Sequence, residues 1–189
     1  FQDGRYPTEG GLRYWLTALG QHSTSDEQVL VDEEQHIEVA IQRLNRHQNK
    51  LELLVADIEN GRARVLLTEQ DPAWVNVHDD LRFFSDGRRL LWASERDGFR
   101  HLYVYSLEGQ QLAQLTRGPW MVTGVAGLDE KNQAVWFSST RRSPLERHLE
   151  RISLKLNAQS LAVSAGEPAE ITRQPGTHAP LLSPDFTFF

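Results

Sequence analysis

The 189-residue chain contains no cysteine. That absence excludes disulfide bonds, thiolate metal sites and a cysteine nucleophile. Long apolar runs are also missing, because no stretch approaches the roughly 18 residues that a membrane-spanning helix needs. The net charge is −6 without a basic stripe, so neither nucleic acid nor a membrane is an expected partner. At 39% hydrophobic and 24% charged residues, the composition is that of a globular protein rather than a disordered one.

Two sequence patterns of enzymes are missing as well. No serine has glycine both two residues before and two residues after it, so the G-x-S-x-G elbow of α/β-hydrolases is absent. The chain shows no βαβ alternation, no glycine-rich phosphate loop and no metal-ligand spacing. We therefore expect no Ser-Asp-His machinery, no cofactor and no metal in this chain.

What the chain does contain is a repeat. The segment RLLWASERDGFRHLYVYSL covers residues 89–107, and AVWFSSTRRSPLERHLERISL covers 134–154. A weaker copy, ELLVADI at 52–58, aligns with HLYVYSL at 101–107 at a step of 49. In the two stronger copies, Trp92 matches Trp136 at a step of 44 residues. Two further matches have a step of 47 residues: Arg100-His101-Leu102 with Arg147-His148-Leu149, and Ser106-Leu107 with Ser153-Leu154.

Each copy is followed by a short strand that ends near a threonine, at Thr68, Thr116 and Thr172. New strand starts follow in FFSDG at 83–87 and LLSPD at 181–185. Periods of about 40 to 50 residues with about four strands each are typical of β-propeller blades. The sequence therefore predicts an all-β partial β-propeller with about four blades of antiparallel four-stranded sheets. A β-sandwich with chance similarity is the alternative.

The first strong copy also predicts local structure. Alternation over residues 101–105 predicts a strand with one buried face, preceded by a polar loop over 94–98. Gly98 is expected to take a positive φ in that loop. Arg100 is expected to pair with Asp97 or Glu95, or to reach a neighbouring blade.

Both ends of the chain look cut, because it begins Phe1-Gln2-Asp3 and ends within an apparent strand at Phe186–Phe189. We expect residues 1–189 to be a fragment of a single β-propeller domain. A partial propeller leaves unpaired strand edges on its first and last blades, so self-association through these edges is expected.

Several motifs together resemble the N-terminal propeller of the dipeptidyl peptidase IV family in the prolyl oligopeptidase clan. They are RLNRHQNKLELLVAD (43–57), WVNVHDDLRFFSDG (74–87), SERDGFRHLYVY (94–105), LTRGPWMVTGV (115–125), SPLERHLERISL (143–154) and HAPLLSPD (178–185). The likeness covers most of the chain from about residue 40 onward, and the bacterial members and the dipeptidyl peptidase 8 and 9 branch look closest.

This resemblance implies an eight-bladed propeller packed on a C-terminal α/β-hydrolase domain, which is absent here. It implies a peptide substrate, from which the enzyme releases N-terminal dipeptides with proline preferred at the second position. It also implies a propeller that restricts access to the active site and supplies two glutamates for the substrate's N-terminus. A periplasmic or secreted bacterial location is suspected from the family alone.

No residue is assigned a catalytic, cofactor-binding or metal-binding role. His101 and His148 are repeat-equivalent, which favours a role in the scaffold. The triplet Asp32-Glu33-Glu34 is the candidate anchor for an ammonium group. It lacks the aromatic strand that follows the family's glutamates, so it is interpreted as a solvated loop, with the true pair expected upstream of residue 1.

The segment 78–81 offers a second cluster. His78, Asp79 and Asp80 are candidate ligands of a divalent cation. The alternative is that the aspartates cap backbone N–H groups at the entrance of a blade. Trp74 and Val75 are expected to face the substrate tunnel, as the same segment does in relatives.

The sequence thus predicts the access-shaping propeller portion of a dipeptidyl peptidase IV-like serine exopeptidase, inactive by itself. The alternative is a stand-alone propeller-like module that binds a protein or peptide. A metal-dependent hydrolase is a third reading and would require bound metal.

Overall fold

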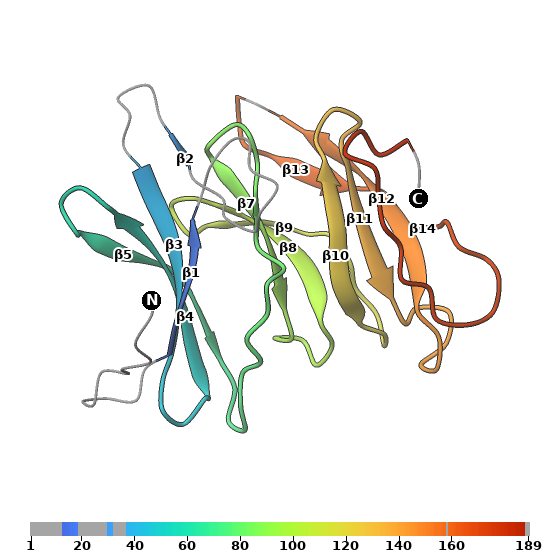
Figure 1. Cartoon of the computed structure of the whole chain (residues 1–189), viewed down its shortest axis with the longest axis horizontal. Helices are drawn as coiled ribbons and strands as arrows, with labels where there is room; N and C mark the ends of the chain where they lie inside the picture. The colour runs from blue at the N-terminus through green and yellow to red at the C-terminus, as the bar shows by residue number, and fades with distance from the viewer. Residues whose placement is uncertain (1–12, 19–29, 32–36, 158, 188–189) are drawn as a thin grey trace. The chain divides into compact units, whose positions relative to one another are not determined.

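The computed structural model describes residues 13–18, 30–31, 37–157 and 159–187. In these ranges, all regular secondary structure is β-strand (Figure 1). No helix there is long and apolar enough to cross a membrane. The chain divides into two compact units, residues 1–77 and 78–189. The all-β prediction is confirmed, and the described strands form three antiparallel sheets.

The first unit holds one sheet with the strand order β1-β3-β4-β5, in which β2 also pairs with β3. Its strands are β1 (Arg13–Ala18), β2 (Leu30–Val31), β3 (Ile37–Leu44), β4 (Lys50–Asp57) and β5 (Ala63–Gln70). In β4, the alternation of apolar and polar residues gives a strand whose centre is buried.

The second unit holds two sheets, ordered β6-β7-β8-β9 and β10-β11-β12-β13, with β14 also paired to β12. The first has β6 (Arg82–Phe83), β7 (Arg89–Ser94), β8 (His101–Ser106) and β9 (Gln111–Gln114). The second has β10 (Val122–Asp129), β11 (Ala134–Ser139), β12 (His148–Leu156), β13 (Val163–Ala165) and β14 (Ala169–Glu170).

One hydrophobic core lies between these two sheets, which face each other in Figure 1. Apolar side chains that alternate along the central strands of each sheet meet there, as in adjacent propeller blades. The buried members are Phe84, Leu91, Ala93, Leu102, Val104, Leu115, Val122, Val125, Val135, Phe137, Ile152 and Leu154.

The strand pairing confirms the steps of 47 and 49 residues. His101 lies opposite Ser94 across β7 and β8, and His148 lies opposite Ser139 across β11 and β12. Glu52 lies opposite Arg43 across β3 and β4 and takes the corresponding place in the first sheet. β4, β8 and β12 are therefore the same strand of three successive repeats.

The predicted equivalence of Trp92 and Trp136 is wrong by one residue. Counted from the serines that face the two histidines, Trp92 corresponds to Phe137 and Trp136 corresponds to Leu91. A shift of one residue moves a strand side chain to the opposite face. Trp136 accordingly stacks on Phe186 at 6.5 Å between ring centroids, away from the core that contains Phe137. Both tryptophans are buried as expected, with 0% and 8% exposure.

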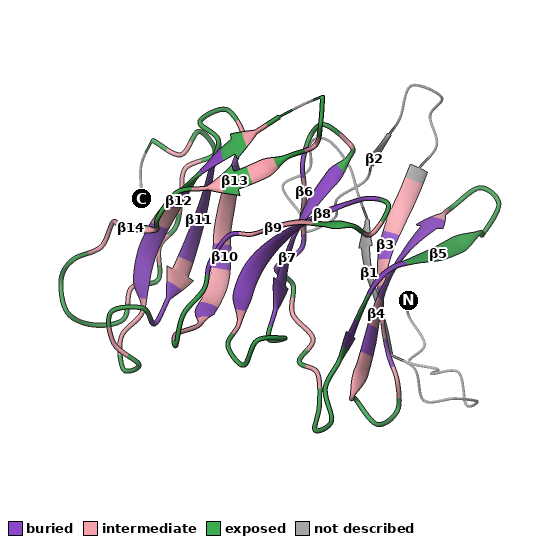
Figure 2. Ribbon diagram, turned by 180° about the vertical axis from the view of Figure 1, so that it is seen from behind, coloured by how far each residue is buried: buried purple, intermediate pink, exposed green. Residues whose placement is uncertain are grey.

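The half-buried strand predicted over 101–105 is also corrected. All six residues of β8 are buried, as Figure 2 shows. Leu102 and Val104 lie in the core between the sheets. On the other side, the guanidinium carbon of Arg96 lies 4.8 Å and 5.4 Å from the ring centroids of Tyr103 and Tyr105. Alternate side chains of β8 therefore point to two faces of the sheet that are both covered, and neither face is exposed to solvent.

A fourth repeat begins at the end of the described chain. The turn before β7 has a hydrogen bond from Gly87 N–H to Phe84 O, and Gly87 has φ 62°. Phe186 has φ 57°, and its N–H donates to Ser183 O in the same way. This shared turn matches residues 84–87 with 183–186, so the predicted correspondence of 83–87 with 181–185 is off by one residue. The described residues thus form three sheets and the first turn of a further repeat.

Candidate functional site

Polar residues of the second unit gather where β8 and β12 begin, around the two repeated histidines. His101 is fully buried. Its Nε2 lies 3.0 Å from Gly118 O, and its Nδ1 lies 3.0 Å from Thr116 Oγ1. Because a carbonyl can only accept, Nε2 carries the hydrogen and Nδ1 accepts from the threonine. Thr116 Oγ1 accepts in turn from Leu102 N–H at 3.0 Å, and both ring nitrogens of His101 have a hydrogen-bond partner.

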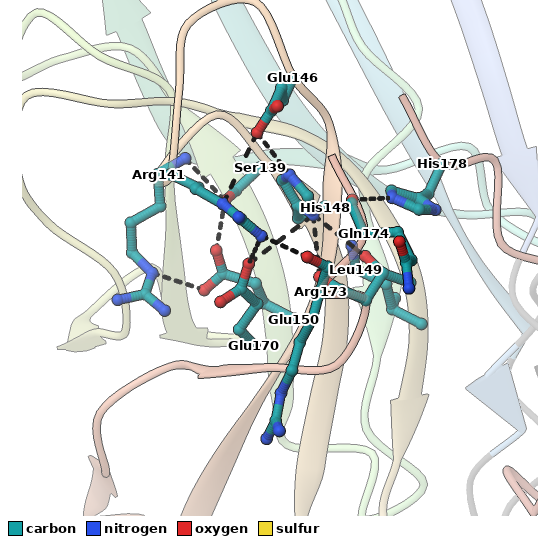
Figure 3. A network of polar contacts seen from close by, with 12 residues as sticks. Ser139, Arg141, Glu146, His148, Leu149, Glu150, Glu170, Arg173, Gln174 and His178 are labelled. Carbon is teal, nitrogen blue, oxygen red and sulfur yellow. Dashed lines mark hydrogen bonds and ion pairs between the residues drawn. The ribbon is translucent and has the colours of Figure 1, made fainter. Parts of the chain in front are cut away.

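His148 repeats this arrangement with one difference (Figure 3). It is also fully buried, and Leu149 N–H donates to Thr172 Oγ1 at 2.9 Å. The Nδ1 of His148, however, lies 2.8 Å from Thr172 O, and its Nε2 lies 2.9 Å from Glu146 Oε2. Both partners are acceptors, and Thr172 Oγ1 also lies 3.4 Å from Nδ1. The Oε1 of Glu170 lies 3.7 Å from Nδ1 and adds a second carboxylate.

A chain of ion pairs extends from His148 across the loop 140–147. The hydrogen bond from His148, with the charge of nearby Arg142, holds the pKa of Glu146 below its usual value. Arg142 donates from Nη1 to Glu170 Oε1 at 3.1 Å and to Arg173 O at 2.6 Å. These contacts join the loop to the segment that follows β14.

Glu150 is a buried carboxylate next to this chain, with 1% exposure. It accepts from Ser139 Oγ at 2.7 Å and from Arg141 Nε at 2.8 Å. The equivalent place in β8 is occupied by Tyr103, over which Arg96 stacks. The repeat therefore keeps the arginine and changes its partner from an aromatic ring to a carboxylate.

The cluster at 78–80 is arranged for structure. His78 Nε2 lies 2.6 Å from Ala93 O, and its Nδ1 accepts from Asp80 N–H at 3.3 Å. The carboxylate of Asp80 accepts from Arg100 and, at 2.8 Å, from Val125 N–H in the next sheet. The prediction that an aspartate caps a backbone N–H at a blade entrance is confirmed for Asp80. Across the described ranges, no three His, Cys, Asp or Glu side chains are grouped to hold a metal ion.

Arg100 is therefore in a structural ion pair, as expected, and its carboxylate partner is Asp80 in the segment before β6. The loop places Gly98 at φ 92°, which confirms the predicted turn. Because that turn brings Arg100 to the start of β8, its guanidinium reaches the segment that leads into β6. A contact between residues 20 positions apart lies outside any local pattern.

The other predicted candidates lie elsewhere. Trp74 is 65% exposed in the first unit, and Val75 N–H donates to Gln48 O at 2.6 Å. Whether these two face a substrate tunnel stays a prediction. The triplet Asp32-Glu33-Glu34 lies outside the described residues.

Sequence reasoning missed the carboxylates that hold this site together, Glu146, Glu150 and Glu170. The available signal was the pair Arg141-Arg142 beside the repeated His148, since clustered arginines require nearby acids. Chemically, the described side chains can bind, orient and carry protons. A serine nucleophile needs a histidine base within hydrogen-bond reach. In the described part of the chain, both buried histidines instead contact threonine hydroxyls, backbone carbonyls and carboxylates.

Comparison with known proteins gives one consistent result. The family model described as "Dipeptidyl peptidase IV (DPP IV) N-terminal region" matches residues 26–189. A probable dipeptidyl peptidase 4 of Neosartorya fischeri is 28% identical over 129 residues, which are 65% of this chain and 17% of that protein. Dipeptidyl peptidase 4 of Trichophyton equinum is 26% identical over 142 residues, 72% of this chain and 18% of that protein.

Solved structures agree in fold. The dipeptidyl peptidase 4 of Porphyromonas gingivalis superposes with a TM-score of 0.65 at 25% identity, covering 79% of this chain and 20% of that one. A putative dipeptidyl aminopeptidase IV of Bacteroides ovatus gives a TM-score of 0.62 at 20% identity, covering 92% and 25%. The chain thus spans about a fifth of the length of the proteins that it matches.

Proposed function

Because this chain belongs to the family of dipeptidyl peptidase IV N-terminal regions, we propose that it is the propeller portion of a serine exopeptidase. In this proposal the parent protein carries a C-terminal α/β-hydrolase domain, and the propeller shapes the path by which peptides reach it. The parent releases dipeptides from the N-terminus of peptides and prefers proline at the second position.

The observation that carries the proposal is the family match over residues 26–189, together with relatives that are matched over only 17% and 18% of their own length. The polar chemistry of the described residues is compatible with it. Both buried histidines and the carboxylates beside them are engaged in holding loops together. A peptidase of this clan needs an activated serine, a histidine base and an oxyanion hole in one geometry. The chain has no G-x-S-x-G elbow to supply the first of these.

The experiment has two arms. The purified chain is incubated with a Gly-Pro chromogenic amide and with a fluorophosphonate probe, and we expect neither turnover nor labelling of any serine. The open reading frame that contains the chain is then expressed in full. We expect it to encode G-x-S-x-G followed by Asp and His within about 250 residues, the size of one α/β domain. The full product should hydrolyse the same amide and take up the probe at that serine.

The outcomes separate this proposal from its rival. Turnover or stoichiometric labelling of the chain alone would overturn the inactive-propeller assignment. A full product without the elbow would favour a stand-alone propeller that binds a protein or peptide. A product that has the elbow and fails to release dipeptides would overturn the exopeptidase assignment. Gly-Ala and Gly-Pro amides compared at equal concentration test the preference for proline.

A further inference from the structure

The two arginines of the repeated Arg-His-Leu motif differ in their partners. The guanidinium of Arg100 forms an ion pair with the carboxylate of Asp80. Its counterpart Arg147 donates from Nη1 to Pro144 O at 3.0 Å and to Glu146 O at 2.8 Å. Those two backbone contacts fix the half-buried side chain while leaving its Nε and Nη2 without a partner among the described residues. Arg147 is thus a positioned cation that lacks the carboxylate present in the preceding repeat.

The sequence around Arg147 supplies no replacement for Asp80. Residues 117–128, which lead into the sheet, contain no acidic residue. In the loops beside Arg147, Glu146 is bound by His148 and Arg142, and Glu170 is bound by Arg142. The carboxylates of Glu146 and Glu170 therefore already have other partners.

Two further arginines lie in loops that are hydrogen-bonded to the loop of Arg147. Arg117 and Arg173 are exposed, and neither has an ion pair within the part of the chain that the structure describes. The loops that carry the three arginines are joined by hydrogen bonds. Thr140 N–H donates to Met121 O at 2.9 Å, and Arg147 N–H donates to Gly176 O at 3.2 Å. We call Arg117, Arg147 and Arg173 the arginine surface.

We propose that the arginine surface binds a carboxylate group of a peptide, with Arg147 as its central contact. A guanidinium presents N–H groups in a planar fork that matches the two oxygens of a carboxylate. The backbone contacts of Arg147 reduce the entropy that is lost when such a pair forms. Leu145, which is 88% exposed in the same loop, offers an apolar contact beside the charge. The binding needs no catalytic domain and is independent of the function proposed above.

The net charge of the whole chain distinguishes local binding at the arginine surface from a general attraction for acidic peptides. At −6, the chain repels an acidic peptide unless positive charge is concentrated locally. The test uses fluorescein-labelled peptides and fluorescence anisotropy with the 189-residue chain. One peptide carries glutamates and a free C-terminus, a second carries glutamates and a C-terminal amide, and a third has glutamine in place of glutamate with the same amide.

We expect the first peptide to bind and the third not to bind, with affinity falling as salt is raised. The second peptide identifies the source of the carboxylate. Retained binding assigns it to a side chain, and lost binding assigns it to the C-terminus. Absence of binding by both acidic peptides, or equal binding of the neutral peptide, would overturn the proposal.

Substitution locates the contact. Arg147→Gln should weaken binding by about tenfold, since a hydrogen bond to a charged group contributes about that factor. Arg147→Lys keeps the positive charge but lacks the planar pair of N–H donors, so its affinity for the peptide should lie between those of the parent and of Arg147→Gln. Arg173→Gln, at an exposed position that cannot perturb the fold, should weaken binding to a smaller extent. Lys131→Gln, which removes the same charge at the opposite end of the sheet, is the matched control. Equal effects of Arg147→Gln and Lys131→Gln would refute the assignment.

Discussion

The neutral state of His78 should make the stability of this chain depend on pH in a defined direction. Its Nε2 donates to Ala93 O, and its Nδ1 accepts from Asp80 N–H. The ring also lies 4.5 Å from Trp92 between centroids. Burial, with the nearby charge of Arg100, lowers the pKa of His78 from 6.5 to about 4. The geometry agrees, because a proton on Nδ1 would remove the acceptor that Asp80 N–H uses.

The magnitude follows from these two values. Below pH 6.5 the unfolded chain takes up a proton on His78, whereas the folded chain does not until the pH is near 4. Stability is therefore full above pH 6.5 and falls as the pH falls through this window. A difference of one pKa unit corresponds to about 1.4 kcal/mol, so the loss at pH 4 is about 3 kcal/mol.

The perturbation that isolates this contribution is His78→Gln. Glutamine can donate to Ala93 O and cannot take up a proton in this range. Urea unfolding followed by tryptophan fluorescence gives the free energy of unfolding of both proteins at about pH 7.5, 6.5, 5.5 and 4.5. Glutamine is expected to be neutral or destabilising at the highest pH, and to gain on the parent as the pH falls. Parallel stability curves for the two proteins would refute the buried, neutral histidine.

Three further results are expected. A Cβ on Gly127 would lie 2.4 Å from Phe186, so Gly127→Ala should displace that ring and cost about 1–3 kcal/mol in thermal unfolding, whereas Gly124→Ala, with open space around it, should not. Trp92→Ala should cost about 3–5 kcal/mol by urea unfolding, and Trp136→Ala less, because the Trp92 side chain is fully buried whereas Trp136 keeps 8% of its surface exposed; a larger loss at Trp136 would contradict this reasoning. The chain should self-associate through open strand edges, and a compact monomer at high concentration in sedimentation would count against this.

Much of the fold could be predicted because equivalent positions in successive repeats carry the same residue types, so the same pattern can be recognised more than once. The step of 47 residues placed His101 and His148 correctly, since each must begin the same strand and meet a threonine. The tryptophans misled, because a large apolar side chain is tolerated on either covered face of a blade. From the sequence alone, it could not be predicted on which of the two faces each tryptophan lies.

The site was less predictable, because its partners are distant in the chain. Arg100 finds Asp80 across 20 positions, and Arg142 finds Glu170 across 28. From charge alone, Asp97 and Glu95 are equally suitable partners for Arg100 and are nearer in sequence. The pair with Asp80 depends on the fold, which brings the segment before β6 to the start of β8.

By itself, the sequence determined that the chain is built from strands in repeats of nearly constant length, without a nucleophile elbow or a thiolate. These properties follow from local alternation, turn residues and composition, which each short segment carries on its own. The tertiary structure decided which charges are neutralised. His101 and His148 have the same flanking arginine and leucine, and each contacts a carbonyl and a threonine hydroxyl, yet only His148 also contacts the carboxylate of Glu146. That difference depends on where separate loops meet, and chain packing alone fixes it.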